Sequence, residues 1–156
     1  MRKGIGWVPA LVLPVLLGAG LYGQDDSRPD LTGKWQLNSS KSDMQLNRVS
    51  DLSMVITEKD GKINIIETET LTDGKPRTVT FNCTTDGKDC KVPEDKATAS
   101  FWYNGPMLVS MVTKHNGSEV VRERLSLKPD TKELSVEISS LVPQSDKKDK
   151  LVFEKQ

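Results

Sequence analysis

Five glycines, each preceded by Asp or Asn, recur along the chain at intervals of 13, 13, 18 and 12 residues, at positions 61, 74, 87, 105 and 117. Asp-Gly and Asn-Gly pairs are strong signals for short β-hairpins, because they accept the positive φ angles that tight turns between strands require. The segments between them are about ten residues long, enough for one strand each. The spacing therefore predicts antiparallel strands with short connections, and two further turns are expected at 129–131 and 145–147.

The segments between the turns are rich in β-branched and aromatic residues that alternate with polar ones. Nine strands are expected, at 34–37, 52–57, 62–71, 77–83, 97–103, 107–113, 120–127, 133–138 and 150–154. No segment has the period of an amphipathic helix, and the polar stretch 39–50 holds at most one short helix or an irregular crossover. Closing a barrel hides strand edges from solvent. We therefore predict an all-β fold, an antiparallel up-and-down meander of about 8–10 strands that closes into a barrel, with a two-sheet sandwich as the alternative.

The N-terminal segment has the pattern of a secretory signal peptide. Arg2 and Lys3 form a basic start, residues 4–24 carry no charge, and small residues follow the apolar run at 18–20 and 23. We expect export with cleavage near 20–23, which leaves residues 24–156 as one β-barrel domain in the periplasm or outside the cell. The uncharged run is close to the roughly 20 residues that span a bilayer, so an uncleaved anchor in the inner membrane is the alternative.

Charge and composition exclude several functional classes. The chain of 156 residues has 22 basic and 22 acidic residues, and removal of residues 1–23 leaves a net charge of −2. This balance argues against a nucleic-acid or anionic-membrane partner. Two cysteines and one histidine are too few for a Cys/His zinc site, and we expect no metal site and no cofactor.

The two cysteines lie symmetrically about Asp86-Gly87. A two-residue hairpin there places Cys83 and Cys90 opposite each other, with Cα atoms about 5.5 Å apart, a separation that disulfides favour. An exported chain also meets an oxidising compartment. We expect a structural disulfide that contributes about 2.5 kcal/mol; two free thiols are the alternative.

The segment from Pro29 to Asn38 contains Gly33-Lys34-Trp35 and resembles the first strand, with its G-x-W motif, of the lipocalin and fatty-acid-binding protein superfamily. The segments 84–88, 125–130 and 151–155 are similar to those of small secreted bacterial lipocalin-like proteins. The resemblance implies a calycin-like barrel in which Gly33 and Trp35 are structural and Trp35 closes one end of the core. The arginine that lipocalins pack across this tryptophan is missing, because no arginine follows Arg124.

Two groups of residues are candidates for ligand binding. Phe101 and Tyr103 share one face of their strand with two alanines, and such a face either lines an apolar site or packs as ordinary core. Arg122 and Arg124 either face solvent, as the apolar residues on the other strand face favour, or point inward to bind a carboxylate or phosphate. Glu67 and Glu69 lie on the face of Ile63 and Ile65, so an inward Arg–Glu network is a third possibility.

No arrangement typical of an enzyme is present, since G-x-S-x-G, H-E-x-x-H and phosphate-binding glycine loops are all missing. His115 adjoins a turn, where a solvated surface role is expected. We therefore expect no catalytic residues and no enzymatic activity. The leading hypothesis is an exported, monomeric lipocalin-like protein that binds a small apolar or amphipathic molecule inside the barrel. An envelope-associated interaction module with a filled core is the alternative.

Overall fold

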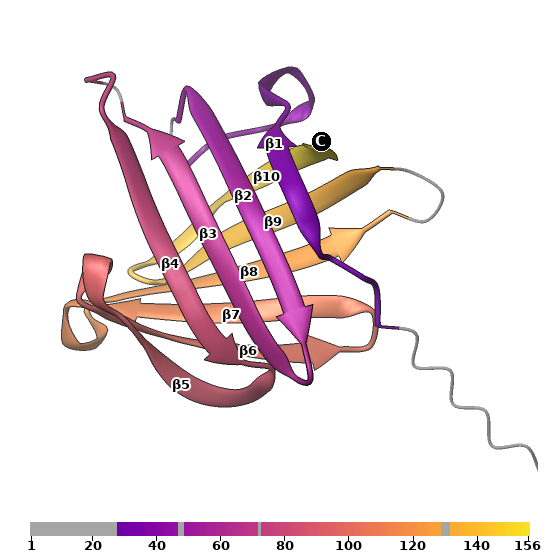
Figure 1. The fold of residues 1–156 in the computed structure, drawn as a ribbon. Coiled ribbons are helices and arrows are strands. Elements are labelled where there is room, and N and C mark those ends of the chain that lie inside the picture. Colours follow the sequence, from indigo (N-terminus) through magenta and orange to yellow (C-terminus); the bar gives the residue numbers. More distant parts are fainter. Residues whose placement is uncertain (1–27, 47–48, 72, 129–131) are drawn as a thin grey trace, which may run out of the picture.

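The computed structural model describes residues 28–46, 49–71, 73–128 and 132–156. The proposed signal peptide and the turn expected at 129–131 lie outside these residues. Ten strands follow one another along the chain (Figure 1): β1 (Gly33–Leu37), β2 (Asp51–Lys59), β3 (Lys62–Thr70), β4 (Pro76–Thr84), β5 (Asp86–Val92), β6 (Ala97–Asn104), β7 (Met107–Lys114), β8 (Glu119–Leu127), β9 (Glu133–Val142) and β10 (Gln144–Lys155).

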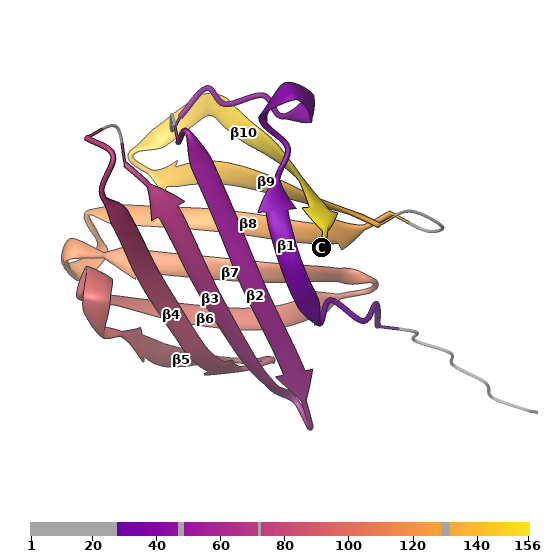
Figure 2. The same ribbon diagram turned by 45° about the horizontal axis from the view of Figure 1, so that its top comes forward.

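The ten strands form one antiparallel sheet in the order β4-β3-β2-β1-β10-β9-β8-β7-β6-β5. Every pair of neighbours is consecutive in the chain except β1 and β10, which join the first strand to the last through Trp35 opposite Lys155. The sheet curves round on itself into a nearly closed barrel, with β1–β4 crossing the face formed by the later strands (Figures 1 and 2). The predicted up-and-down barrel is therefore confirmed, and the sandwich alternative is wrong.

The turns follow the glycine pattern with informative exceptions. Asp60 and Gly61 form a two-residue hairpin turn between Lys59 and Lys62, with φ angles of 52° and 72°. The prediction of a turn at 145–147 is wrong, because those residues belong to β10. The chain reverses before them, at Val142–Pro143 between β9 and β10. A proline ends the β9 ladder there because it has no N–H to donate.

One strand was missed. The strand β5 has the sequence DGKDCKV, and only its last residue, Val92, is buried. It lies at an edge of the sheet, where a strand can carry polar side chains on both faces. Its sequence therefore lacks the apolar alternation by which the other strands were predicted.

The segment between β1 and β2 contains a single 3-10 turn, Ser39–Lys41, and then an irregular crossover. Asp43 forms an isolated β-bridge with Lys150, through backbone hydrogen bonds of 2.8 and 2.7 Å. Asp149 fixes the next residues, because its buried carboxylate accepts hydrogen bonds from the backbone N–H groups of Gln45 and Leu46 at 2.5 and 2.6 Å. Backbone and side-chain hydrogen bonds from two adjacent residues of β10 thus hold the crossover in place.

The disulfide between Cys83 and Cys90 is present, with a Cα–Cα separation of 5.4 Å. The hairpin ladder expected around the disulfide is absent, because β4 and β5 are the two edges of the sheet and not hydrogen-bonded neighbours. The disulfide therefore joins the edges covalently at the one seam in the barrel where the described strands do not pair.

Trp35 is only 1% exposed, and its indole N–H donates a hydrogen bond of 2.9 Å to the carbonyl of Leu31. The ammonium group of Lys155 lies 5.3 Å from the centre of the Trp35 ring, within the range of a cation–π contact. Lys155 also approaches Gly33, where a Cβ would lie 2.5 Å from its Cε atom. A lysine of the last strand thus supplies the cation that the missing arginine would have provided.

Candidate ligand-binding cavity

A cavity of about 220 Å³ lies inside the barrel, against inward-facing side chains of strands from both halves of the sheet. Its apolar wall includes Met54 of β2, Ile65 of β3, Phe81 of β4, Leu125 of β8 and Phe153 of β10. Met44 and Val49, from the crossover after β1, border it as well. The volume is below the roughly 300–1,000 Å³ of drug-sized pockets, so the cavity suits a small molecule.

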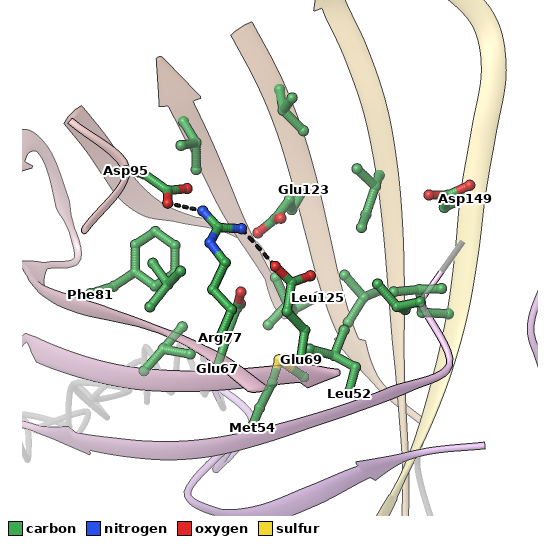
Figure 3. A pocket seen from close by; sticks show the side chains of 18 of the residues that line it. Leu52, Met54, Glu67, Glu69, Arg77, Phe81, Asp95, Glu123, Leu125 and Asp149 are labelled. Atoms are coloured by element: carbon green, nitrogen blue, oxygen red, sulfur yellow. Dashed lines mark hydrogen bonds and ion pairs between the residues drawn. The ribbon is translucent and has the colours of Figure 1, made fainter. Parts of the chain in front are cut away.

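One wall of this cavity is an ion-pair network centred on Arg77 of β4 (Figure 3). Its guanidinium group pairs with Glu69 of β3 at 2.6 Å and with Asp95, which follows β5. Asp95 also pairs with Lys114 of β7 at 3.0 Å. The network brings together residues from four separate segments, and it links the edge strand β4 to the far side of the seam.

Two further carboxyl groups face the same space. Glu123 of β8 accepts a hydrogen bond of 2.9 Å from the buried hydroxyl of Ser110. Glu67 of β3 lies beside the pair formed by Glu69 and Arg77 (Figure 3). Both side chains are enclosed by protein, and the surface that remains open borders the cavity.

The enclosure changes the acidity of both groups. Burial, reinforced by the charges of Glu123 and Glu69, raises the pKa of Glu67 to about 8. Burial also raises the pKa of Glu123, although the hydrogen bond from Ser110 opposes the shift. Desolvation disfavours a carboxylate, and nearby like charges add to that effect. At neutral pH Glu67 is therefore mostly a neutral carboxylic acid.

The residues predicted from their strand faces lie elsewhere. Phe101 is buried and packs edge-on against Phe81, with ring centroids 5.7 Å apart, so it takes the core-packing alternative. Tyr103 is half-buried; its hydroxyl donates a hydrogen bond of 2.6 Å to Glu58, and Arg28 lies 4.9 Å from its ring centre. Neither aromatic residue borders the cavity.

The two arginines of β8 lie on the outer face of the barrel. Their neighbours Glu123 and Leu125 line the cavity, and successive side chains of a strand point to opposite faces. Arg124 pairs with Glu137 of β9 at 3.0 Å. Arg122 and Arg124 thus take the solvent-facing alternative, and the inward Arg–Glu network is built on Arg77 instead. His115 is exposed at the turn after β7, as expected.

Sequence reasoning missed Arg77, Asp95, Lys114 and Glu123 as cavity residues. A signal for part of the set was present, because Glu67, Glu69 and Glu123 each alternate with apolar residues on a core-facing strand face. Three acidic residues at inward positions indicate a polar interior. Arg77 gave the same signal, since it shares its strand face with Val79 and Phe81.

Within the described part of the chain, no group of three or more His, Cys, Asp or Glu side chains is placed to hold a metal ion. The same residues contain no helix long and apolar enough to cross a membrane.

No protein-family model and no curated protein sequence matches the chain. Solved structures match by shape. A mutant of the fluorescent protein UnaG has a TM-score of 0.57 at 15% identity, over 80% of this chain and 95% of that one. A secretory abundant heat soluble (SAHS) protein from Ramazzottius varieornatus has a TM-score of 0.56 at 12% identity, over 81% of this chain and 95% of that one.

A fatty-acid-binding protein from Manduca sexta also matches, with a TM-score of 0.46 at 15% identity, over 67% of this chain and 72% of that one. The first two likenesses agree with the strand order described above. The protein therefore has the fold of the calycin-like β-barrels, the superfamily that the Gly33-Lys34-Trp35 segment resembles.

Proposed function

We propose that the protein binds a small apolar or amphipathic molecule non-covalently in the interior cavity. The observation that carries the proposal is the cavity itself, whose lining combines apolar side chains such as Met54, Ile65 and Phe81 with a set of ionisable groups. Ligand pockets combine a mostly apolar lining with a few placed polar groups. Non-covalent binding requires no catalytic residue, and we propose that the protein is not an enzyme.

The alternative, an envelope-associated interaction module, assumed a barrel filled by its own side chains. A cavity of about 220 Å³ inside the barrel is at odds with that assumption. Binding of a small molecule is therefore the better-supported function of the two.

We propose further that the protein is exported and acts as a monomer in the periplasm or outside the cell. Residues 1–23 would be the cleaved signal peptide and residues 24–156 the barrel domain. The basic start and the uncharged run support this proposal, and the disulfide between Cys83 and Cys90 suits an oxidising compartment. N-terminal sequencing of the protein recovered from the host's periplasm or medium tests it, with a new terminus expected near residue 21 or 24. An intact Met1 in the membrane fraction would support the retained anchor.

Binding is tested with the neutral fluorescent probe N-phenyl-1-naphthylamine, whose emission rises when it enters an apolar site. Val136→Phe, which adds bulk to a side chain lining the cavity, is expected to abolish the rise. The matched control is Val55→Phe on the outer face of β2, where the side chain is already exposed. Circular dichroism checks that both variants fold, since overpacking costs about 1–3 kcal/mol. Equal probe binding by the two variants would contradict binding in the cavity.

A further inference from the structure

The ionisable groups around the cavity are unequal in number. Among the residues that the structure describes, six carboxyl groups and two cationic groups line it: Glu67, Glu69, Asp95, Glu119, Glu123 and Asp149 against Arg77 and Lys114. Asp149 is held by the backbone N–H groups of Gln45 and Leu46. The other five carboxyl groups still outnumber the two described cations, and burial of an acidic group without a cationic partner is costly.

The two cations are already engaged with protein carboxylates. Arg77 pairs with Glu69 and Asp95, and Lys114 pairs with Asp95 at 3.0 Å and lies 3.8 Å from Glu119. A ligand carboxylate that binds either cation would have to share it with these partners. An anionic ligand would also face the remaining carboxyl groups, which like-charge repulsion makes unfavourable.

The carboxyl groups of Glu67 and Glu123 have fewer partners than those of Glu69 and Asp95. The sole hydrogen bond of Glu123 among the described residues is the one from Ser110. Glu67 has no hydrogen bond or ion pair with any described residue, and only the charges around it act on it. A group that supplies positive charge and several N–H donors would satisfy both carboxyl groups.

The apolar residues of the lining indicate the rest of the ligand's structure. Met54, Ile65, Val79 and Leu125 present apolar surface to the same space, and no described group of side chains is arranged to hold a metal ion. An organic cation with an apolar body meets both conditions, since its ammonium group donates hydrogen bonds while its body packs against these residues.

We propose that the cavity binds a small amphipathic amine, with the ammonium group between Glu67 and Glu123 and the apolar part against Met54, Ile65 and Leu125. The inference rests on the proposed function, because it assigns a ligand class to the same cavity. It also separates this protein from a carboxylate carrier: the arginine facing the interior, Arg77, is already held by two acidic side chains.

Amine binding should be coupled to release of a proton. A cation favours the ionised form of a neighbouring carboxyl group, so a bound amine lowers the raised pKa of Glu67, about 8 in the empty cavity. The groups that act on Glu67 are Glu69 of its own strand β3, Arg77 of the neighbouring strand β4, Lys114 of β7 and Glu123 of β8. Affinity for the amine should therefore rise between pH 6 and pH 8.5, a range in which an alkylamine remains protonated.

The test is isothermal titration of the purified protein with three compounds of one chain length, octylamine, 1-octanol and octanoate. The amine is expected to bind at least about tenfold more tightly than the alcohol, and the carboxylate more weakly than either. Titration at pH 7 in buffers of different ionisation enthalpy is expected to show proton release for the amine alone.

The matched variants are Glu67→Gln and Glu137→Gln; the second makes the same substitution on the outer face of β9. Glu67→Gln should reduce amine affinity about tenfold, remove its rise with pH and leave the alcohol unaffected, whereas Glu137→Gln should change none of these. Glu123→Gln provides a second test with the same expected direction.

The outcomes separate this inference from the proposed function. If the alcohol and the neutral probe bind but the amine binds no better, the cavity takes ligands and the assignment to amines is wrong. Preferred binding of octanoate would likewise overturn it. If none of the three compounds nor the neutral probe binds, the proposed function itself fails.

Discussion

The interior of this barrel contains two regions of opposite character on the same strands. The packed region consists of fully buried side chains that do not border the cavity, among them Leu31, Trp35, Ile56, Ile63, Val92, Phe101, Leu108 and Leu134. The charged cavity is lined by Glu67, Glu69, Arg77, Asp95 and Glu123 together with an apolar wall. The strand β3 shows the change directly, since its inward positions run from Ile63 and Ile65 to Glu67 and Glu69.

This difference indicates a division of labour within one sheet. The packed region contributes burial of apolar area, which is the dominant favourable term in folding. The charged cavity contains a buried carboxyl group, Glu67, and an unfilled volume. A sequence selected for stability alone would have neither. Retention of costly buried groups is expected where they serve binding. Mutations in the two regions should therefore differ in the sign of their effect on stability.

The largest expected effect is a loss of stability in the packed region. Trp35→Ala should lower the free energy of unfolding by about 3–5 kcal/mol, because it leaves a large void that the rigid barrel cannot fill. Urea denaturation followed by circular dichroism measures the change. Trp102→Ala is the matched control, since Trp102 is only half-buried on the outer face of β6, and about 1 kcal/mol is expected there. Equal losses would contradict the special role of the packed region.

A change in the charged cavity should have the opposite sign. The pKa of Glu67 is about 8 in the folded protein against 4.5 ordinarily, so the unfolded chain loses a proton that the folded chain keeps. Wild-type stability attributable to this group is thus fully present below pH 4.5 and is lost as the pH rises to about 8. Glu67→Gln should be neutral at pH 4 and stabilising by on the order of 4 kcal/mol at pH 8.

Urea denaturation of wild type and Glu67→Gln between pH 4 and pH 8.5 measures this difference. Glu137→Gln, on the outer face of β9, serves as the control and should show no such growth with pH. A Glu67→Gln variant that is less stable than wild type at pH 8 would show that the group is ionised and paired in the folded protein.

Removal of the disulfide should affect stability without affecting binding. The double variant Cys83→Ser, Cys90→Ser should lose about 2.5 kcal/mol, because the unfolded chain regains the freedom of the closed loop. Neither cysteine borders the cavity, so affinity for the neutral probe should be unchanged while the protein is folded. A parallel loss of binding would show that the seam between β4 and β5 shapes the cavity.

The smallest expected effect concerns the cation above Trp35. Lys155→Met keeps the aliphatic chain and removes the charge, and it should cost about 0.5–1 kcal/mol. Lys62→Met, at an exposed position at the start of β3, is the control and should be neutral within measurement. A thermal unfolding series on both variants would show whether the contact at 5.3 Å contributes beyond packing.

Local patterns predicted the strands well where one face is buried. The segment 62–71 alternates clearly and became β3, whereas β5 escaped prediction because an edge strand with one buried residue has no alternation to detect. The Cys83–Cys90 pair was predicted correctly although its expected hairpin ladder does not exist. The two edges approach closely enough for a disulfide without sharing hydrogen bonds.

The candidate site was harder to predict than the strands. Alternation placed Phe101 on an inward face, but whether an inward residue packs or lines a cavity depends on the side chains opposite it. Those come from strands distant in the chain, as in the contact between Phe101 and Phe81. Glu69 and Arg77 lie opposite each other on the neighbouring strands β3 and β4. For the same reason the second partner of Arg77, Asp95, could not be inferred until the two edges of the sheet were placed side by side.

By itself, the sequence determined the all-β architecture, the regular spacing of the hairpin turns, the inward face of most strands and the pairing of its only two cysteines. These properties depend on turn chemistry and on a period of two residues, both of which are local. Only the tertiary structure decided that the seam lies between β4 and β5, that Lys155 covers Trp35, and that acidic side chains outnumber cations among the described residues around one cavity. Charge balance and enclosed volume depend on which strands face one another, and barrel closure sets that arrangement.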